Sequence, residues 1–174
     1  TGTADIALEI AKKDPKPSQI VGMDFSISML NLGRKKVFTN RFDKRIQLIP
    51  AAAENIPLKD RTFDGAITAF GVRNFLDSKQ GLKEMYRILK PNGKIVVLEF
   101  SFPKKGILNN LYRLYFEKIL PLLGRIISGH KSAYSYLPES VANFPQGEAF
   151  NERLKFSGFK NVFFKPLTLG IVTI

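Results

Sequence analysis

The sequence contains no cysteine and only one histidine, His130, among its 174 residues. The absence of cysteine excludes disulfides, thiolate metal sites and a cysteine nucleophile, and a single imidazole argues against a histidine-rich metal centre. No apolar run reaches the ~20 residues that a membrane-spanning helix needs. Repeats, low-complexity tracts and a linker between domains are also missing. We therefore expect one domain, residues 1–174, built around a single hydrophobic core.

Acidic residues are few relative to basic ones. Lys plus Arg number 27 against 15 Asp plus Glu, which gives a formal net charge of +12. Such an excess attracts polyanions, so it is compatible with nucleic acid, with an anionic membrane surface, or with a solvated basic surface that binds neither. Charge alone does not choose among these three.

A glycine loop at the start of the chain, with an acidic residue about 20 positions later, indicates a site for a nucleoside cofactor. The string Thr1-Gly2-Thr3-Ala4-Asp5 leads into an apolar helix, and the strand-like segment 20–24 ends at Asp24. Backbone N–H groups of such a loop can approach a ligand closely, and a carboxylate at a strand tip can accept hydrogen bonds from both ribose hydroxyls. Because a hydrophobic strand precedes the loop in such folds, the sequence predicts an N-terminally truncated chain that lacks its first strand.

Strand-like and helical segments alternate along most of the chain, which is typical of a mainly parallel sheet covered by helices on both faces. Ser26 and Ser78 are the predicted N-caps of two helices. The Pro91-Asn92-Gly93 turn is followed by a run with the composition of a central strand. The strands that we expect are 20–24, 46–50, 63–70, 94–100, 162–165 and 169–174.

The segment from about 103 to 150 interrupts this alternation. Its first half, 107–127, is rich in Leu, Ile, Tyr and Phe with basic residues among them. Two interpretations are open: an amphipathic helix packed on the sheet, or a lid-like insertion that contacts an apolar substrate or the membrane interface. We favour the lid because an apolar face and a high basic content occur together.

Ordered strings throughout the chain resemble the S-adenosylmethionine-dependent C-methyltransferases of menaquinone and ubiquinone biosynthesis. The two most particular are Phe70-Gly71-Val72-Arg73-Asn74 and Tyr134-Ser135-Tyr136-Leu137-Pro138-Glu139-Ser140. Others are Gly22-Met23-Asp24-Phe25-Ser26, Leu89-Lys90-Pro91-Asn92-Gly93-Lys94, Leu98-Glu99-Phe100-Ser101 and Phe144-Pro145-Gln146-Gly147. The resemblance covers essentially the whole chain. The string Phe144-Pro145-Gln146-Gly147 is more similar to the menaquinone branch of the family than to the ubiquinone branch.

The resemblance implies an α/β fold of the Rossmann-like class I methyltransferase type, with a seven-stranded mixed sheet and helices on both faces. It implies S-adenosyl-L-methionine as the cofactor and C-methylation of a polyprenylated quinol. Demethylmenaquinol is the first candidate substrate, and the 2-polyprenyl-6-methoxy-1,4-benzoquinol of ubiquinone biosynthesis is the alternative. A cytoplasmic protein associated peripherally with the inner face of the membrane is the location that such a substrate predicts.

The cofactor-binding residues that the resemblance implies are Gly2, Thr3, Asp24, Ala52, Ala53 and Ala69. The glycine loop would surround the methionine moiety, Asp24 would bind the ribose, and residues 52–53 would flank the adenine. The family commonly has glycine in place of Ala4 and polar residues in place of Ala52 and Ala69. Contacts at those two positions would therefore come through the backbone or through packing.

Carbon methylation requires more than alignment of donor and acceptor in a dry site. A quinol ring carbon becomes nucleophilic when a phenolic oxygen loses its proton, so we expect a reduced substrate and a group that removes or stabilises that proton. The candidate catalytic residues are Arg73, Asn74, Glu99 and Tyr136.

Each candidate has a structural alternative. Arg73 could stabilise a phenolate or form a salt bridge, and Glu99 could have a perturbed proton affinity or be a satisfied structural acceptor. Tyr134 and Tyr136 could line the substrate site or belong to the core. His130 lies in the lid segment, where a lone histidine is more often solvated than a base.

Other classes of protein share some of these features. A dinucleotide-dependent oxidoreductase would share the glycine loop and Asp24. A nucleic-acid methyltransferase would explain the charge, but the sequence has no Asn/Asp-Pro-Pro-Tyr string and no cysteine for attack at a pyrimidine carbon. A non-enzymatic basic module would leave the cofactor motifs unexplained. We therefore expect an enzyme without a nucleic-acid partner, and an oligomer is compatible with the sequence.

Overall fold

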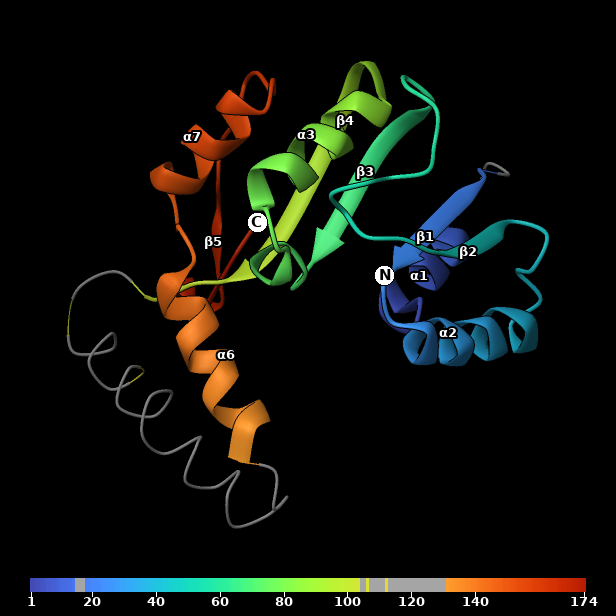
Figure 1. Ribbon diagram of the computed structural model, residues 1–174, viewed down its shortest axis with the longest axis horizontal. Helices are drawn as coiled ribbons and strands as arrows, with labels where there is room; N and C mark the ends of the chain where they lie inside the picture. The colour runs from blue at the N-terminus through green and yellow to red at the C-terminus, as the bar shows by residue number, and fades with distance from the viewer. Residues whose placement is uncertain (15–17, 104–105, 107–111, 113–130) are drawn as a thin grey trace. The chain divides into compact units, whose positions relative to one another are not determined.

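The computed structural model describes residues 1–14, 18–103, 106, 112 and 131–174 (Figure 1). The chain divides into two compact units, of which the first comprises 1–66 and 75–94 and the second comprises 67–74 and 95–174. Two strands, β3 (Phe63–Ala69) and β4 (Leu89–Phe100), have their first parts in the first unit and their last parts in the second. A single methyltransferase domain over residues 1–174 stays a prediction.

The first unit begins with two helices and two strands that follow the predicted alternation. They are α1 (Asp5–Lys13), β1 (Ile20–Asp24), α2 (Ile27–Thr39) and β2 (Ile46–Pro50). The strands β1 and β2 pair in parallel, with Ile20 opposite Ile46, and both helices contact both strands. Side chains of α1, α2 and β2 form one buried cluster, in which Leu30 is fully buried, and the partly buried Ile20 of β1 packs against it. The predicted Ser26 cap is confirmed, because its side chain accepts a hydrogen bond from the backbone of Met29.

The first unit also contains α3 (Ser78–Ile88), whose N-cap differs from the predicted one. Asp77, not Ser78, is the cap: its Oδ1 accepts from the backbone N of Lys79 at 2.9 Å and of Gln80 at 3.1 Å. Both residue types cap helices well, and the choice falls on Asp77 because its backbone is extended, with φ of −128° and ψ of 96°.

Strand β4 begins at Leu89, five residues before the predicted start at Lys94. The predicted turn is nevertheless present inside it. Asn92 has a left-handed φ of +65°, and a Cβ on Gly93 would lie only 2.9 Å from the backbone oxygen of Lys90. These two observations mark a local turn inside the strand.

The second unit contains the ends of β3 and β4 and the C-terminal part of the chain. Its other elements are η1 (Val72–Asn74), α6 (Lys131–Asn143), α7 (Glu148–Phe156), β5 (Pro166–Leu167), η3 (Thr168–Gly170) and β6 (Val172–Thr173). The sheet has the strand order β3-β4-β6-β5, and β6 is antiparallel to both β4 and β5. A mixed α/β architecture is thus confirmed, whereas a seven-stranded sheet stays a prediction.

The C-terminal strands differ from the prediction of 162–165 and 169–174 separated by Pro166. Pro166 lies inside β5, opposite Thr173, and residues 168–170 form a 3-10 turn instead of a strand. Proline is tolerated here because β5 is the last strand in the order, where a missing N–H on the outer side breaks no ladder.

The predicted lid-like insertion, about 103–150, falls largely outside the described residues, including most of 107–127 and His130. Its described C-terminal part contains α6 and the start of α7, which the sequence analysis did not predict as helices. Among the helices of the described ranges, none is long and apolar enough to cross a bilayer.

Candidate functional site

Asp24 ends β1, and backbone N–H groups hold its carboxylate in place. Oδ2 accepts from the backbone N of Gly2 at 2.7 Å and from the amino nitrogen of Thr1 at 3.1 Å, and Oδ1 accepts from the backbone N of Ser26 at 2.9 Å. Burial raises the pKa of the Asp24 carboxyl, but these hydrogen bonds outweigh burial and hold the pKa below its usual range. The group is therefore ionised at neutral pH, and of the about four acceptor sites of a carboxylate one, on Oδ1, is left for a further donor.

The glycine loop turns sharply before α1. Gly2 has φ of +57° and Ala4 has φ of +65°, and the backbone N of Ala4 donates to the carbonyl of Thr1 at 3.1 Å. Ala4 is fully buried, although its left-handed backbone favours the glycine that the family commonly has there. A Cβ on Gly2 would meet nothing within 4 Å, so the loop is open on that side.

Thr3 uses its hydroxyl for contacts within the protein. Its Oγ1 donates to Asp5 Oδ2 at 2.6 Å and accepts from Lys36 Nζ at 2.8 Å, and Lys36 also pairs with Asp5 at 2.7 Å. The hydrogen bond from Lys36 is the largest cause of the lowered pKa of Asp5. Because the hydroxyl is occupied, we expect Thr3 to meet a ligand through its backbone.

The three alanines expected at the cofactor lie in two places. Ala52 and Ala53 begin an irregular segment after β2, which is joined to the tip of β1 because the backbone N of Ala51 donates to the carbonyl of Asp24 at 3.1 Å. Ala52 is exposed and Ala53 is half-buried, so these small apolar side chains are accessible in the segment that follows Ala51. Ala69 ends β3 in the second unit.

The first unit therefore has the groups that a nucleoside requires. An ionised acceptor at a strand tip suits the two ribose hydroxyls, and an open glycine loop suits close approach of a ligand to backbone N–H groups. Small side chains in the segment joined to the same strand tip leave room for a flat ring. These residues fit an adenosine-containing cofactor.

Arg73 and Glu99 form a buried ion pair in the second unit. Arg73 Nη1 lies 2.7 Å from Glu99 Oε2, and the two side chains are only 10% and 6% exposed. The guanidinium also lies over the ring of Phe100, 5.3 Å from its centroid. Within the described part of the chain, Arg73 Nε is the one buried side-chain polar atom without a hydrogen-bond partner. The structural alternatives for both residues are thus observed, and their chemical roles stay predictions.

Asn74 and Tyr136 are linked beside this ion pair. The hydroxyl of Tyr136, on α6, donates to Asn74 Oδ1 at 2.7 Å, and Asn74 Nδ2 donates to the carbonyl of Phe70 at 3.2 Å. Tyr136 is 52% exposed, so it is not a core aromatic. The structure brings all four predicted catalytic candidates together around η1, whereas the Tyr134 side chain and His130 lie outside the described residues.

Two residues that the sequence analysis missed hold the segment after β2. Glu84 and Arg87, both on α3, bind the backbone around Ile56. Their spacing of three on a helix is a signal for an ion pair, but it does not say that they reach a loop.

Comparison with known proteins identifies the family. All of the chain, residues 1–174, matches the ubiE/COQ5 methyltransferase family. It is 48% identical to the ubiquinone/menaquinone biosynthesis C-methyltransferase UbiE of Geotalea daltonii, over 100% of this chain and 74% of that protein. It is 42% identical to the demethylmenaquinone methyltransferase of Thermus thermophilus, over 100% of this chain and 77% of that protein.

A solved structure with a similar fold is the S-adenosylmethionine-dependent methyltransferase of Thermotoga maritima, a possible histamine N-methyltransferase. It has a TM-score of 0.62 and 24% identity, over 94% of this chain and 61% of that one, and at this identity the likeness shows the fold alone. The class I methyltransferase fold and S-adenosylmethionine as the cofactor are confirmed. The chain belongs to the ubiE/COQ5 methyltransferase family.

Proposed function

We propose that demethylmenaquinol is the lead substrate of this S-adenosylmethionine-dependent C-methyltransferase. The observation that carries the proposal is the family match over all 174 residues, with relatives named for quinone C-methylation. The benzoquinol of ubiquinone biosynthesis is the second candidate, because the relative at 48% identity is named for both pathways.

The first unit supplies the cofactor contacts in this proposal. S-adenosylmethionine supplies an electrophilic methyl group on a sulfonium when it is bound. Asp24 accepts hydrogen bonds from the ribose hydroxyls, the loop of Gly2 and Thr3 approaches the methionine moiety, and residues 52–53 pack beside the adenine. The lowered pKa of Asp24 and the open side of Gly2 support this assignment.

The second unit supplies the contacts to the quinol. Asn74 and Tyr136 are exposed, whereas Arg73 and Glu99 are almost completely buried, so we assign substrate contact to the first two residues. The hydroxyl of Tyr136 donates to Asn74 and can still accept a hydrogen bond from a quinol hydroxyl. That bond draws the phenolic proton toward Tyr136 Oη and raises electron density at the ring carbon. Arg73 and Glu99 then act as positioning residues that fix η1.

We also propose peripheral association with the inner face of the membrane. A polyprenylated quinol resides in the lipid, and a formal charge of +12 favours an anionic surface. Co-flotation with anionic but not with neutral vesicles supports this location, and equal flotation with both removes the electrostatic argument.

Methyl transfer to defined acceptors tests the proposed function. The purified protein is incubated with labelled S-adenosylmethionine and with demethylmenaquinol or the benzoquinol, each reduced and oxidised. We expect label in reduced demethylmenaquinol and none in the oxidised quinone. Label only in the benzoquinol selects the second candidate, and label in neither quinol overturns the substrate assignment while leaving the family intact. Tyr136→Phe should lower kcat more than it changes the KM of the cofactor.

A further inference from the structure

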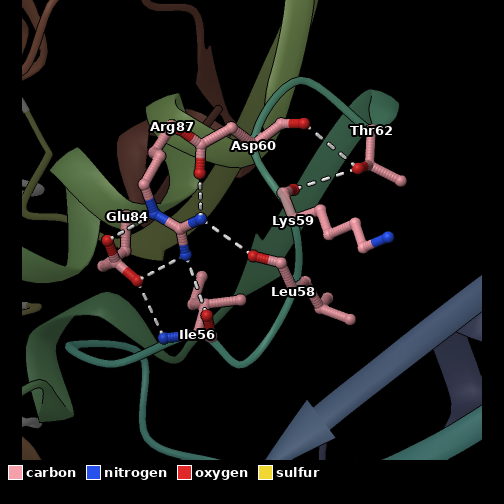
Figure 2. Close-up of polar contacts among 7 residues, drawn as sticks. All are labelled: Ile56, Leu58, Lys59, Asp60, Thr62, Glu84 and Arg87. Atoms are coloured by element: carbon pink, nitrogen blue, oxygen red, sulfur yellow. Dashed lines mark hydrogen bonds and ion pairs between the residues drawn. The ribbon is translucent and has the colours of Figure 1, made fainter.

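Arg87 uses every donor of its guanidinium on segment 56–60 and on the carboxylate of Glu84 (Figure 2). Nη2 donates to the carbonyl of Ile56 and Nη1 to the carbonyl of Leu58, both at 2.8 Å. Nη1 also donates to Asp60 Oδ1 at 2.5 Å, while Nε and Nη2 bind the two oxygens of Glu84 at 2.7 and 2.8 Å. These bonds match the five N–H donors of a planar guanidinium, a pattern that lysine cannot reproduce.

Glu84 completes the arrangement from the same helix. Its Oε2 accepts from the backbone N of Ile56 at 2.9 Å, so both polar groups of the Ile56 backbone are bound to α3. The hydrogen bonds from Arg87 are the largest cause of the lowered pKa of Glu84. The pair is therefore charged at neutral pH, and each bond to the backbone is a strong, charge-assisted one.

The segment held in this way, residues 51–62, connects β2 to β3 without regular secondary structure. Only short local turns support it from within, such as Leu58 N to Ile56 O at 2.8 Å. It is fixed at its start by the bond from Ala51 N to the carbonyl of Asp24, at 3.1 Å, and at Ile56 by Glu84 and Arg87. Residues 52–53 lie between these two fixed points.

A second, weaker set of contacts ends at the same stretch. Glu54 Oε1 accepts from the backbone N of Asp77 at 3.2 Å, and Gln80 Nε2 donates to the carbonyl of Glu54 at 3.4 Å. A Cβ on Gly81 would lie 3.4 Å from the Cβ of Ala53, so α3 packs directly beside that residue. The helix thus determines where residues 52–53 lie, and Arg87 makes the largest number of the polar contacts that connect it to this segment.

We propose that Arg87, supported by Glu84, is a positioning residue that sets the affinity for S-adenosylmethionine without touching it. It does so by holding residues 52–53 in the conformation that packs beside the adenine. This inference rests on the proposed function for the assignment of residues 52–53 to the adenine. Without Arg87, segment 51–62 populates several conformations, and the apparent affinity falls by the fraction that remains competent.

Calorimetric titration with S-adenosylhomocysteine tests the proposal without any quinol. Arg87→Met keeps the aliphatic stem and removes all donors. We expect its Kd to rise on the order of 10-fold to 100-fold, which corresponds to about 10% to 1% of molecules having segment 51–62 in the conformation that binds the cofactor. Arg87→Lys keeps the charge but loses the planar fork, so its Kd should rise by nearly as much. In steady state the KM for S-adenosylmethionine should rise, while kcat at saturation and the KM for the quinol stay close to the wild-type values.

Lys90→Met is the matched control. Lys90 pairs with Asp64 at 2.8 Å in the same unit, and within the described structure its side chain makes no hydrogen bond to segment 51–62, so its loss should leave the Kd unchanged. Glu84→Gln removes one charge but keeps the side-chain shape, and it replaces Arg87→Met if that variant does not fold.

The outcomes separate this inference from the proposed function. A folded Arg87→Met or Glu84→Gln protein with wild-type Kd overturns the positioning role, as does a loss of kcat with unchanged KM for the cofactor. Wild-type protein that binds S-adenosylhomocysteine but methylates neither quinol overturns the substrate assignment instead. In that case the change of Kd in the variants still decides the role of Arg87.

Discussion

Removing one partner of the Arg73–Glu99 ion pair should lower the free energy of unfolding more than removing both partners. The two side chains meet at 2.7 Å and are 10% and 6% exposed. Removing one partner of such a pair leaves an uncompensated charge in the interior and costs about 3–5 kcal/mol, whereas replacing both with apolar residues of similar volume is close to neutral. We therefore expect Arg73→Met and Glu99→Leu each to lower the free energy of unfolding by about 3–5 kcal/mol.

The double variant Arg73→Met/Glu99→Leu should be more stable than either single variant. Urea unfolding followed by circular dichroism measures all four corners of the cycle, and an unchanged m-value shows that the comparison is of stability. For a domain of this size the single losses correspond to a fall in Tm of about 6–20 °C. Lys155→Met is the control, because the ion pairs that it breaks, with Glu148 and Glu152, are exposed. Additive losses in the double variant would refute the argument.

Two further predictions concern α3. A Cβ on Gly81 would lie 2.6 Å from Phe75 Cδ2, so Gly81→Ala should lose about 1–3 kcal/mol to overlap against a gain of ~1 in helix propensity. Adding Phe75→Leu should restore the stability lost by Gly81→Ala, as measured in thermal melts. If stability is not restored, overlap with Phe75 is not the cause of the loss. The hydrogen bonds from Arg87 hold the pKa of Glu84 below its ordinary value of 4.5, so the unfolded state binds more protons as the pH falls. Stability should therefore decline below that pH, and Glu84→Gln should make the decline shallower in urea titrations at several pH values.

The first part of the fold could be predicted from local pattern. Segments 20–24 and 46–50 match β1 and β2, and Ser26 caps α2 as its residue type suggests. Asp24 also lies at the strand tip, where its spacing from the glycine loop placed it. These predictions succeeded because each depends on residues adjacent in the chain, for which apolar period and capping chemistry are decisive.

The C-terminal strands could not be predicted in the same way. Pro166 marks a break by local rules, yet it lies in β5, because the cost of a proline depends on whether a neighbouring strand needs its N–H. That depends on strand order, which the sequence does not contain. Asp77 and Ser78 are likewise equivalent as caps until the backbone angles of Asp77 are known.

In the candidate site, the residues that contact each other lie far apart in the sequence. Arg73 and Glu99 are 26 positions apart, and Asn74 and Tyr136 are 62 apart. Arg73, Asn74 and Glu99 could be selected by type and by place at a strand end, and Tyr136 by its place in the predicted lid, but the partners follow from tertiary contacts. Arg87 was missed for the same reason, because its partners at Ile56 and Leu58 are backbone carbonyls, which leave no signature in the side-chain sequence.

Several carboxylates in the described part of the chain accept hydrogen bonds from backbone N–H groups outside the α-helices and strands, and they differ in what else they bind. Glu84 binds Ile56 N and is paired with Arg87, and Glu99 binds Arg73 N and is paired with the same residue's guanidinium. Irregular segments lack the repeating backbone hydrogen bonds of a helix or a sheet. A charged side-chain pair that binds their backbone therefore holds them in place where strands end.

Asp24 makes the same kind of backbone contacts, to Gly2 and Ser26. Its cationic partner is the amino nitrogen of Thr1, 3.1 Å from Oδ2, and over the described ranges of the chain no lysine or arginine side chain pairs with it. Side chains of the described residues therefore do not neutralise its negative charge. A carboxylate in that state keeps acceptor capacity for hydroxyl donors from outside the protein, which is the property that a ribose-binding residue requires.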